Sequence, residues 1–379
     1  RRRRAMARLA AALVAALAGS ALAQATASLA PLTEVEVQDE FERFQRRHGR
    51  AYADGRERAL RLGHFRASLE SVRAHNARPA RSFEMGLNQF SDMSDEEFSR
   101  RVLMEEQKCS ATGRRVGAPP AADLPKRVDW REKGVVSEVK NQGHCGSCWT
   151  FSTTGCLEAH MAIKYDAWHA PRLSEQQLVD CAQAFDNHGC NGGLPSHAFE
   201  YVKHAGGLQT EFHYSYKAED GKCAAANASG VRSSSSPFEP TSAGIGVQVP
   251  GGSVNLTVGD EEALKYHIAT HGPVSIAFQV ASDFRHYSRG VYTSMVCKNG
   301  AMDVNHAVLA VGYGVDPETG MPYWLIKNSW DYTWGDEGFF KMEADKNMCG
   351  VADCMAFPDL YGLNAAAAAA DADAGVVVV

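Results

Sequence analysis

The pattern of hydrophobic and polar positions predicts helices in the first part of the chain and strands in the last part. Residues 34 to 76 are rich in charge, and one stripe at helical steps of three and four runs through Glu57, Arg61, Phe65, Ser68, Val72 and Asn76. Three later segments also read as helices: 147–164, 174–182 and 195–204. Beyond Gly259, the runs 273–278 and 304–312 are rich in the apolar and β-branched residues of strands. We therefore expect an α+β fold in which a helical lobe precedes a β lobe.

Shorter signals mark the connections between these elements. Residues 83 to 92 alternate as a strand does, and a helix start follows at Ser94. Gly and paired Pro between positions 114 and 122 predict an exposed linker that proteases can reach. The stretch from 224 to 252, rich in Ala, Ser, Gly and Pro, reads as a surface loop, and the low-complexity tail from 365 to 379 reads as disordered.

The N-terminus has the pattern of a secretory signal peptide. Basic residues through Arg8 precede an apolar run from Leu9 to Leu17, and small residues at Ala21 and Ala23 suit a cleavage site. A membrane anchor needs about 20 apolar residues, and this run is shorter. We expect residues 1–23 to be the signal, with Met6 a candidate start and the arginines before it an artefact.

Composition and charge narrow the classes of function. Hydrophobic residues make up 45% of the chain and aromatic residues 9%, as in a globular protein with a core. The formal net charge is −6, which argues against nucleic acid as the main partner, because phosphate binding needs a concentrated basic face. No later stretch is long and apolar enough to predict a membrane span.

The cysteine count fits a secreted protein. All ten cysteines lie between Cys109 and Cys354, and in an oxidising compartment this number indicates disulfides, whose pairing does not follow from sequence alone. Two sequons, at Asn227 and Asn255, are candidate glycosylation sites in the same compartment.

The strongest chemical signal is the segment from Gln142 to Trp149, which contains the Cys-Gly-Ser-Cys-Trp motif of papain-type proteases. Cys148 opens a predicted helix, where unpaired N–H groups and the macrodipole favour a thiolate. A nearby imidazolium would lower its pKa further and give an ion pair able to attack an acyl group. The side-chain amide of Gln142 can donate to the oxyanion beside the N–H of Cys148.

Two other readings of these paired cysteines are weaker. A Cys-X-X-Cys redox pair belongs in a thioredoxin-like βαβ unit, and the pattern predicts none here. Half of a zinc site would need a second pair of ligands at short spacing, which the chain lacks. We therefore expect neither a metal nor an organic cofactor.

His306 and Asn328 are the candidate partners of the nucleophile. His306 heads an apolar run, and Asn328 ends one. The Asn amide can hold the imidazole in the productive tautomer, and Trp330 can shield that hydrogen bond from water. The two residues follow Cys148 by about 160 and 180 positions, against about 130 to 150 in papain-type proteases, which indicates an insertion.

On these residues the chain from about Glu34 to Leu360 resembles precursors of the papain family. The helical stripe is similar to the family's propeptide pattern Glu-Arg-Phe-Asn-Ile-Asn, with Ser68 and Val72 in place of Asn and Ile, and a second propeptide motif matches Gly86, Asn88, Phe90 and Asp92. The resemblance implies a papain-like two-lobe fold, with a helical left lobe and a β-barrel-like right lobe. It also implies an inhibitory helical propeptide that runs through the cleft in the non-productive direction and is released by acid, with Asp92 a candidate switch.

A narrower resemblance, to cathepsin H and aleurain, covers residues 105–112 and the sequence around Gly155, Gly192 and Gly290. In that group a mini-chain cut from the propeptide stays attached by a disulfide and occupies the non-primed end of the cleft. Its terminal carboxylate, here that of Thr112, would bind the free amine of the substrate and so favour aminopeptidase activity. The boundaries implied are a propeptide at 34–104, a mini-chain at 105–112, a linker at 113–122, a peptidase domain at 123–362 and a tail at 363–379.

Family matching also implies the disulfides and the substrate pocket. The pairs are Cys145–Cys190, Cys181–Cys223, Cys297–Cys349 and Cys109–Cys354. They leave Cys148 free for catalysis and Cys156 as a small buried residue. The residues implied for substrate binding are Gly192, Gly193, Leu194, Pro195, Ala307, Trp330 and Thr112. Two departures stand out: Asp331 replaces a usual Gly beside the active site, and Lys108 removes a sequon that some relatives carry.

The expected protein is a monomeric thiol peptidase, made as a zymogen and directed through the secretory pathway to a lysosome or vacuole, or secreted. Its partners would be peptide and protein substrates, its own propeptide and cystatin-type inhibitors. One alternative is a cathepsin L-like endopeptidase that loses the mini-chain. The other is an inactive papain-fold binding protein, which the presence of both Cys148 and His306 disfavours.

Overall fold

The computed structural model describes residues 30–109, 114–117, 123–167, 171–225 and 245–361. These residues form two units, one up to Arg81 and one from Ser82 onward, and each is described by itself. The predicted signal peptide and tail lie outside the described residues. No helix in the described ranges is long and apolar enough to cross a membrane.

The described residues of the first unit, from position 30 onward, form two helices, α2 (Glu34–His48) and α3 (Gly55–Asn76). Thr33 and Glu36 form a reciprocal capping box at the start of α2. Phe65 of α3 lies 5.3 Å from Phe41 and 5.1 Å from Phe44 of α2, measured between ring centroids. The predicted helical stripe is confirmed, and its members Phe65, Ser68 and Val72 are buried.

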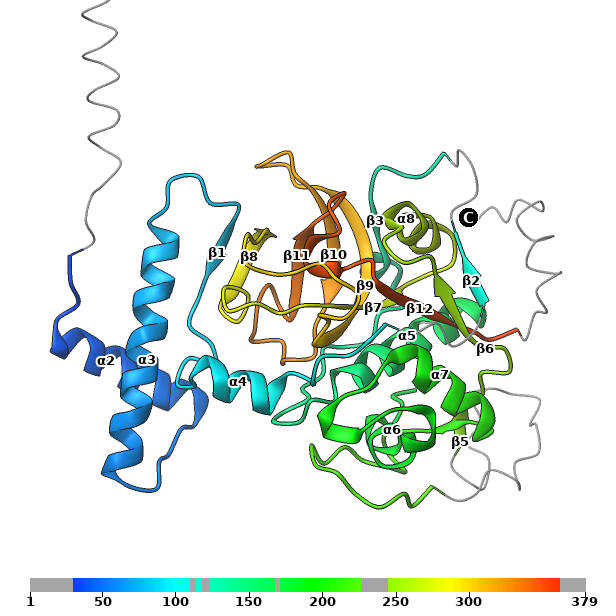
Figure 1. The fold of residues 1–379 in the computed structure, drawn as a ribbon, viewed down its shortest axis with the longest axis horizontal. Helices are drawn as coiled ribbons and strands as arrows, with labels where there is room; N and C mark the ends of the chain where they lie inside the picture. Colours follow the sequence, from blue (N-terminus) through cyan, green and yellow to red (C-terminus); the bar gives the residue numbers. More distant parts are fainter. Residues whose placement is uncertain (1–29, 110–113, 118–122, 168–170, 226–244, 362–379) are drawn as a thin grey trace, which may run out of the picture. The chain divides into compact units, whose positions relative to one another are not determined.

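The other helices of the described residues lie in the second unit. The predicted helical segments are confirmed as α5 (Cys148–Lys164), α6 (Glu175–Cys181) and α7 (Pro195–His204), which lie together on one side of this unit (Figure 1). The others are α4 (Asp95–Val102), α8 (Glu261–Thr270) and the short 3-10 helices η1 (Trp130–Lys133), η2 (Gln183–Phe185), η3 (Gly189–Asn191) and η5 (Met348–Gly350).

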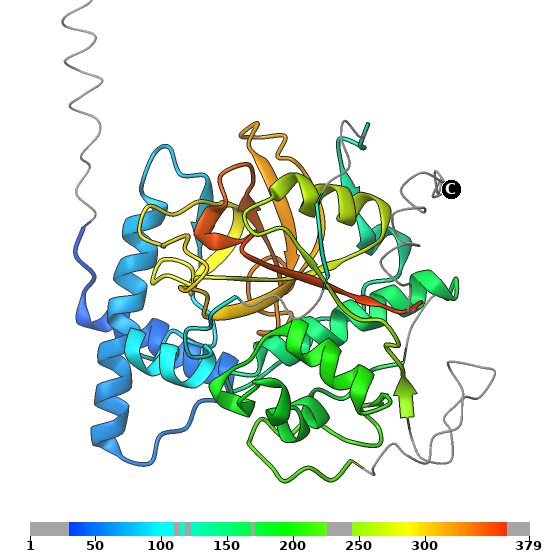
Figure 2. The same cartoon turned by 45° about the vertical axis from the view of Figure 1, so that its right-hand side comes forward.

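The strands gather mainly in one large sheet with the order β1-β8-β11-β10-β9-β7-β12-β6-β2, while β3 pairs with β9. Figure 2 shows this sheet curling beside the helices. The strands are β1 (Phe83–Met85), β2 (Arg114–Val116), β3 (Val128–Asp129), β6 (Gly252–Leu256), β7 (Val274–Phe278), β8 (Tyr287–Tyr292), β9 (His306–Val315), β10 (Pro322–Lys327), β11 (Phe339–Glu343) and β12 (Cys354–Asp359), and a separate pair is formed by β4 (Leu208–Gln209) and β5 (Ile245–Val247).

The core between helices and sheet positions the site. The central strand β9 is buried along nearly its whole length, and α5 packs against it. Almost every residue of α5 is buried, as a central helix requires. The start of α5 and the start of β9 are therefore held against each other, and the predicted helical lobe followed by a β lobe is confirmed.

Part of the predicted exposed linker has regular structure. Residues 114–116 form the edge strand β2, which pairs in parallel with β6, while Arg115 and Gly117 are exposed as expected. The pairing continues beyond the strand, where Thr257 N donates to Val116 O at 3.1 Å. Cys109, bonded to Cys354 of β12, holds the preceding chain close to the sheet edge, where the unpaired groups of β6 accept a new strand.

Candidate active site

Cys148 is the first residue of α5 and is fully buried. Its Sγ accepts a hydrogen bond from the N–H of Ala307 in β9, at 3.3 Å. Burial raises the pKa of the Cys148 thiol to about 12, while backbone N–H groups, among them those of Ala307, Trp149 and Met104, act in the opposite direction. The backbone N–H groups around Cys148 would stabilise a thiolate, but burial of the sulfur in this structure favours the neutral thiol.

His306 opens β9 immediately before Ala307, which touches the thiol. The structure therefore brings the predicted nucleophile and the predicted base together. Nε2 of His306 lies 2.8 Å from Oδ1 of Asn328, and the imidazole stacks on Trp330 with 4.6 Å between ring centroids. Burial lowers the pKa of His306 to about 4, and the hydrogen bond to Asn328 acts against this shift.

The hydrogen bonds of Asn328 assign the tautomer of His306. Oδ1 of Asn328 also accepts from the N–H of Ser329 at 2.8 Å, so this atom is the amide oxygen. An oxygen acceptor requires a proton on Nε2 of His306. Nδ1 is then the basic nitrogen, and among the described residues it has no hydrogen-bond partner.

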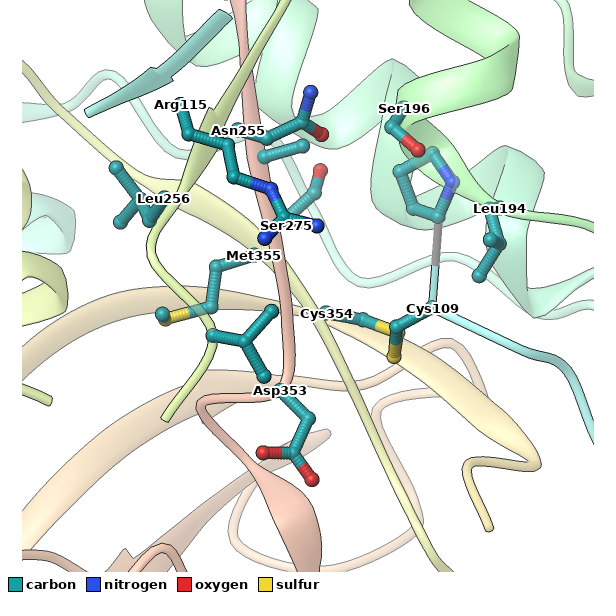
Figure 3. Close-up of a pocket in the computed structure, with 13 residues that line it drawn as sticks. Cys109, Arg115, Leu194, Ser196, Asn255, Leu256, Ser275, Asp353, Cys354 and Met355 are labelled. Carbon is teal, nitrogen blue, oxygen red and sulfur yellow. A yellow bond between two sulfur atoms is a disulfide. The ribbon is translucent and has the colours of Figure 1, made fainter. Parts of the chain in front are cut away.

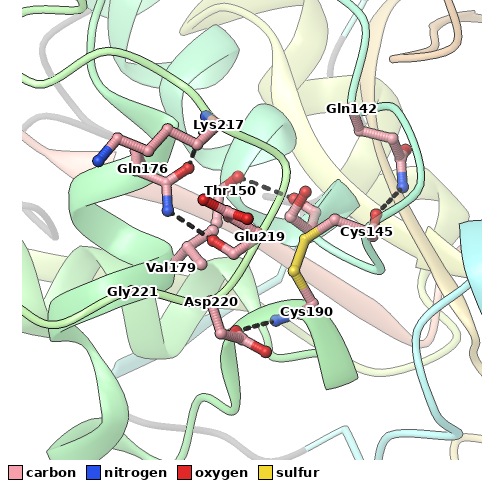
Figure 4. Close-up of a disulfide and its surroundings, with 12 residues drawn as sticks. Gln142, Cys145, Thr150, Gln176, Val179, Cys190, Lys217, Glu219, Asp220 and Gly221 are labelled. Atoms are coloured by element: carbon pink, nitrogen blue, oxygen red, sulfur yellow. Dashed lines mark hydrogen bonds between the residues drawn. A yellow bond between two sulfur atoms is a disulfide. The ribbon is translucent and has the colours of Figure 1, made fainter.

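The side chain of Gln142 is fully buried and held in one orientation. Its Oε1 accepts from Ser329 Oγ at 2.7 Å and from Trp330 Nε1 at 3.1 Å. Its Nε2 donates to the carbonyls of Cys145 and Val102, each at 2.8 Å; Figure 4 shows the bond to Cys145. The carbonyl of Val102 thus accepts a hydrogen bond from the side-chain amide of Gln142, the group predicted to donate to the oxyanion.

Residues 102–107 run between the two sides of the site. Met104 N donates to Asn305 O at 3.1 Å, and Glu105 N donates to Asn191 O at 2.9 Å. Further along, Gln107 forms an antiparallel bridge with Val304. The segment therefore hydrogen-bonds to both sides of the site and covers the thiol with main chain.

The glycines beneath this segment are needed for its close approach. A Cβ on Gly146 would lie 2.8 Å from the carbonyl oxygen of Leu103. A Cβ on Gly192 would lie 2.8 Å from Cβ of Met104, and the φ of Gly192 is +128°. Both positions require a residue without a side chain.

Aromatic rings and ion pairs hold the preceding part of the pro-segment. Phe90 and Phe98 each pack edge-on against Trp330, with 5.5 Å between ring centroids. The buried Arg285 lies 3.1 Å from a carboxylate oxygen of Asp95 at the start of α4. Asp92 is also buried.

The residues predicted for substrate binding lie on both sides of Cys148. Gly192 contacts the pro-segment, and Gly193 packs against Trp149. Leu194 and Pro195 line a pocket next to the Cys109–Cys354 bridge (Figure 3). Ala307 touches the thiol and Trp330 covers His306, as described above, whereas Thr112 lies outside the described residues.

The four predicted disulfides are present. Cys109–Cys354 joins the pro-segment to β12, and Cys145–Cys190 involves a residue three positions before Cys148 (Figures 3 and 4). The other two are Cys181–Cys223 and Cys297–Cys349. Cys148 and Cys156 are the unpaired cysteines, as predicted.

The prediction of a glycan on Asn255 is wrong for this fold. Asn255 lies in β6 between β12 and β2, and its Nδ2, the atom that would carry the sugar, is buried. The sequon pattern does not distinguish a loop from a covered strand. Asn227, the other candidate, lies outside the described residues.

The departure at Asp331 has a local explanation. Its φ is +71°, a conformation that favours Gly and that Asp tolerates better than most residues. Its carboxylate accepts from the N–H and the hydroxyl of Thr333, both at 3.1 Å. The turn therefore keeps its shape without the usual Gly.

Sequence reasoning missed a buried charge network behind the site. Nζ of Lys140 lies 2.7 Å from carboxylate oxygens of both Glu158 and Glu175. Lys327, which precedes Asn328, donates to Ser137 Oγ at 3.0 Å, and Ser137 in turn donates to Glu158. The chain around Ser137 and Lys140 is thus joined to β10 of the β lobe, a contact that no short motif could reveal.

Comparison with known proteins assigns the family. The model for the papain family cysteine protease matches residues 124–359, and that for the cathepsin propeptide inhibitor domain (I29) matches residues 41–98. The chain is 50% identical to "Thiol protease aleurain-like" of Arabidopsis thaliana over 84% of this chain and 83% of that protein. It is 47% identical to "Pro-cathepsin H" of Bos taurus over 84% of this chain and 89% of that protein. The solved structure of the digestive procathepsin L2 proteinase from the larval midgut of Tenebrio molitor superposes with a TM-score of 0.75 at 35% identity, covering 86% of this chain and 100% of that one. The chain therefore belongs to the papain family of cysteine proteases and is the zymogen of a cysteine peptidase that carries its own inhibitory propeptide.

Proposed function

We propose that Cys148 is the nucleophile of this peptidase, His306 its base, Asn328 the group that orients the base and Gln142 an oxyanion donor. The assignment is supported by the hydrogen bond from the N–H of Ala307 to Sγ of Cys148, at 3.3 Å, because His306 directly precedes Ala307 in the chain. The bond of His306 to Asn328 leaves Nδ1 as the nitrogen that takes the thiol proton.

The reaction follows from these positions. With the pro-segment displaced, Nδ1 takes the proton of Cys148, and the thiolate attacks the scissile carbonyl. The carbonyl oxygen becomes an oxyanion that accepts from Nε2 of Gln142 and from the N–H of Cys148. His306 returns its proton to the leaving amine as the C–N bond breaks, which leaves a thioester. His306 then takes a proton from water, the hydroxide attacks the thioester, and the acid product leaves as the thiolate is restored.

We further propose that residues 105–112 remain as a mini-chain and give the enzyme cathepsin H-like aminopeptidase activity with some endopeptidase activity. The Cys109–Cys354 disulfide supports this, because it would keep the segment attached after the chain is cut on either side. The main-chain bonds of Glu105 and Gln107 to the two sides of the site would hold it in place. The free carboxylate of Thr112 would then attract a substrate ammonium and oppose a continuing chain.

Two measurements test the mini-chain proposal. Mass spectrometry of the mature, non-reduced enzyme should show a mass that fits residues 105–112, lost on reduction. The mature enzyme should also cleave dipeptide reporters with a free amine faster than the same reporters with a blocked N-terminus. A mature enzyme that has lost this peptide and prefers blocked reporters would instead be a cathepsin L-like endopeptidase.

The remaining assignments follow from the same reading. We propose the boundaries 1–23 for the signal, 34–104 for the inhibitory propeptide and 123–362 for the peptidase domain, with substrate contacts at Gly192, Gly193, Leu194, Pro195, Ala307 and Trp330. The enzyme would act as a monomer in a lysosome or vacuole, or outside the cell, and cystatin-type inhibitors would bind the cleft. Labelling by a thiol-directed epoxide, lost in Cys148→Ser, tests the nucleophile itself.

A further inference from the structure

Tyr216 hydrogen-bonds to Gln142, one of the proposed oxyanion donors, and to Ser147, which precedes the other donor, Cys148. Its hydroxyl lies 2.7 Å from the carbonyl oxygen of Gln142 and 2.6 Å from Oγ of Ser147. A carbonyl oxygen only accepts, so the single proton of Tyr216 points to Gln142. Ser147 must then donate its own proton to Tyr216. One hydroxyl thus joins Gln142 to the residue immediately before Cys148.

Ser147 uses its side chain in an unusual way. It is the N-cap residue of α5, where a serine ordinarily accepts a hydrogen bond from an N–H of the first turn. Here it makes no side-chain cap, and its ψ is 16° rather than that of an extended residue. Its fully buried hydroxyl is turned to Tyr216 instead. The conformation of Ser147 sets the direction of the next peptide group, which carries the N–H of Cys148.

Tyr216 is itself held from several directions. Its N–H donates to a carboxylate oxygen of Glu211 at 2.9 Å, and its ring packs edge-on against Phe151 of α5, with 4.9 Å between ring centroids. The chain that follows is pinned by Gln176, which accepts from Lys217 N and donates to Glu219 O, both at 2.8 Å (Figure 4). The hydroxyl of Tyr216 therefore has little freedom to follow its two partners if they move.

From this geometry we propose that Tyr216 is a positioning residue for the oxyanion hole. It fixes the position of the Gln142 amide relative to the N–H of Cys148, so that both can donate to the same oxygen. The inference rests on the proposed roles of Cys148 and Gln142. Tyr216 acts through these two residues and does not contact the substrate. Because the oxyanion exists only after thiolate attack, misplaced donors should slow the reaction and leave ground-state binding unchanged.

The test compares two tyrosines of one loop in the mature enzyme. Tyr216→Phe keeps the ring on Phe151 and removes the hydroxyl. The matched control is Tyr214→Phe, which removes a hydroxyl bonded to Asp180 at 2.8 Å and away from Gln142 and Ser147. We expect Tyr216→Phe to lower kcat and kcat/KM about tenfold with KM within about twofold of wild type, and Tyr214→Phe to leave kcat within about twofold.

Two further readouts separate positioning from general damage. Affinity for a peptide aldehyde, which forms a tetrahedral hemithioacetal, should fall by the same factor as kcat in Tyr216→Phe. Alkylation by iodoacetamide needs no oxyanion hole and should keep its rate within about twofold. Ser147→Ala should lose about as much as Tyr216→Phe, and the double variant should lose no more than the worse single one.

Three results would overturn the proposal: an unchanged kcat in Tyr216→Phe, a loss of alkylation rate in step with kcat, or an equal loss in Tyr214→Phe. The first result would show that Tyr216 does not position the oxyanion hole. The other two would show that the substitution disturbs the structure of the loop in general. Cys148→Ala in the same assays reports on the proposed function by itself, since turnover that survives it would refute the nucleophile whatever Tyr216 does.

Discussion

Cys148 and Cys156 are two free thiols on one helix whose surroundings differ. Both are buried in α5, and burial raises the pKa of each to about 12. Their hydrogen bonds differ. Sγ of Cys148 accepts from the N–H of Ala307, whereas Sγ of Cys156 donates to the carbonyl of Pro273 at 3.3 Å, although Ser275 also forms hydrogen bonds that lower the pKa of Cys156. A donor favours the thiolate and a carbonyl favours the thiol, so burial alone does not tell a reactive cysteine from an inert one.

The two thiols also differ in what covers them. The main chain of residues 102–104 lies over Cys148, with the N–H of Met104 directed at the sulfur. Cys156 is covered by the start of β7, which is part of the peptidase core. Removal of the propeptide therefore changes the surroundings of Cys148 and leaves those of Cys156 as they are. A removable cover over a sulfur that is otherwise poised to ionise is how one fold serves as both zymogen and enzyme.

The largest expected effect is on turnover when each cysteine is replaced. Cys148→Ala should reduce kcat by at least about 10⁴-fold, because the nucleophile is lost. Cys156→Ala should keep kcat within about twofold. Steady-state assays of the two mature variants provide the measurement. Comparable losses in both would mean that the contrast in hydrogen-bond direction has no catalytic meaning.

Removal of the cover should have the next largest effect, on alkylation. At neutral pH, iodoacetamide should modify Cys148 of the mature enzyme at least about 100-fold faster than Cys148 of the zymogen, since reaction needs an exposed thiolate. Cys156 should stay unmodified in both until the protein unfolds. Peptide mapping after timed alkylation reports each site separately. Equal rates for Cys148 before and after maturation would contradict the proposed cover.

Acid should weaken the cover through His306. Burial lowers the pKa of His306 to about 4 from an ordinary value of 6.5, so a state in which the imidazole is exposed to water binds a proton more readily than the covered state. As the pH falls from 6.5 toward 4, the uncovered state gains stability relative to the covered state, by roughly 3 kcal/mol at most. We expect the opening equilibrium of the zymogen, measured as its alkylation rate divided by that of the mature enzyme, to rise across this range. A ratio that falls or stays flat would exclude His306 as a contributor.

Much of the fold and of the catalytic set is predictable because those signals are local. The motif around Cys148, the helical periods of α5 to α7 and the apolar run that begins at His306 each lie within one short stretch of chain. The disulfides followed from family resemblance, since spacing alone left their pairing open. Features of this kind can be predicted from a short stretch of sequence, because they do not depend on contacts between distant parts of the chain.

The misses are all products of tertiary pairing. Nothing in the order Arg114, Arg115, Val116 says that these residues will meet β6, and nothing around Asn255 says that its amide will be covered by β12 and β2. Tyr216 is 69 residues from Ser147, and its role depends on a loop that returns to the start of α5. Long-range contacts of this kind involve residue types that are common on any surface, so the local sequence pattern does not predict them.

The smallest expected effect is on stability, and it tests the structural role of Cys156. Cys156→Ala removes one buried sulfur and its weak hydrogen bond to Pro273, which should cost about 1 kcal/mol of unfolding free energy and lower Tm by roughly 2–4 °C. Cys148→Ala in the mature enzyme should cost less, because removal of the pro-segment is expected to expose this sulfur to solvent. Calorimetry of both variants against wild type gives the two values directly. A larger loss of stability in Cys148→Ala would mean that this sulfur also supports packing between α5 and β9. The distinction between a reactive Cys148 and a structural Cys156 would then be wrong.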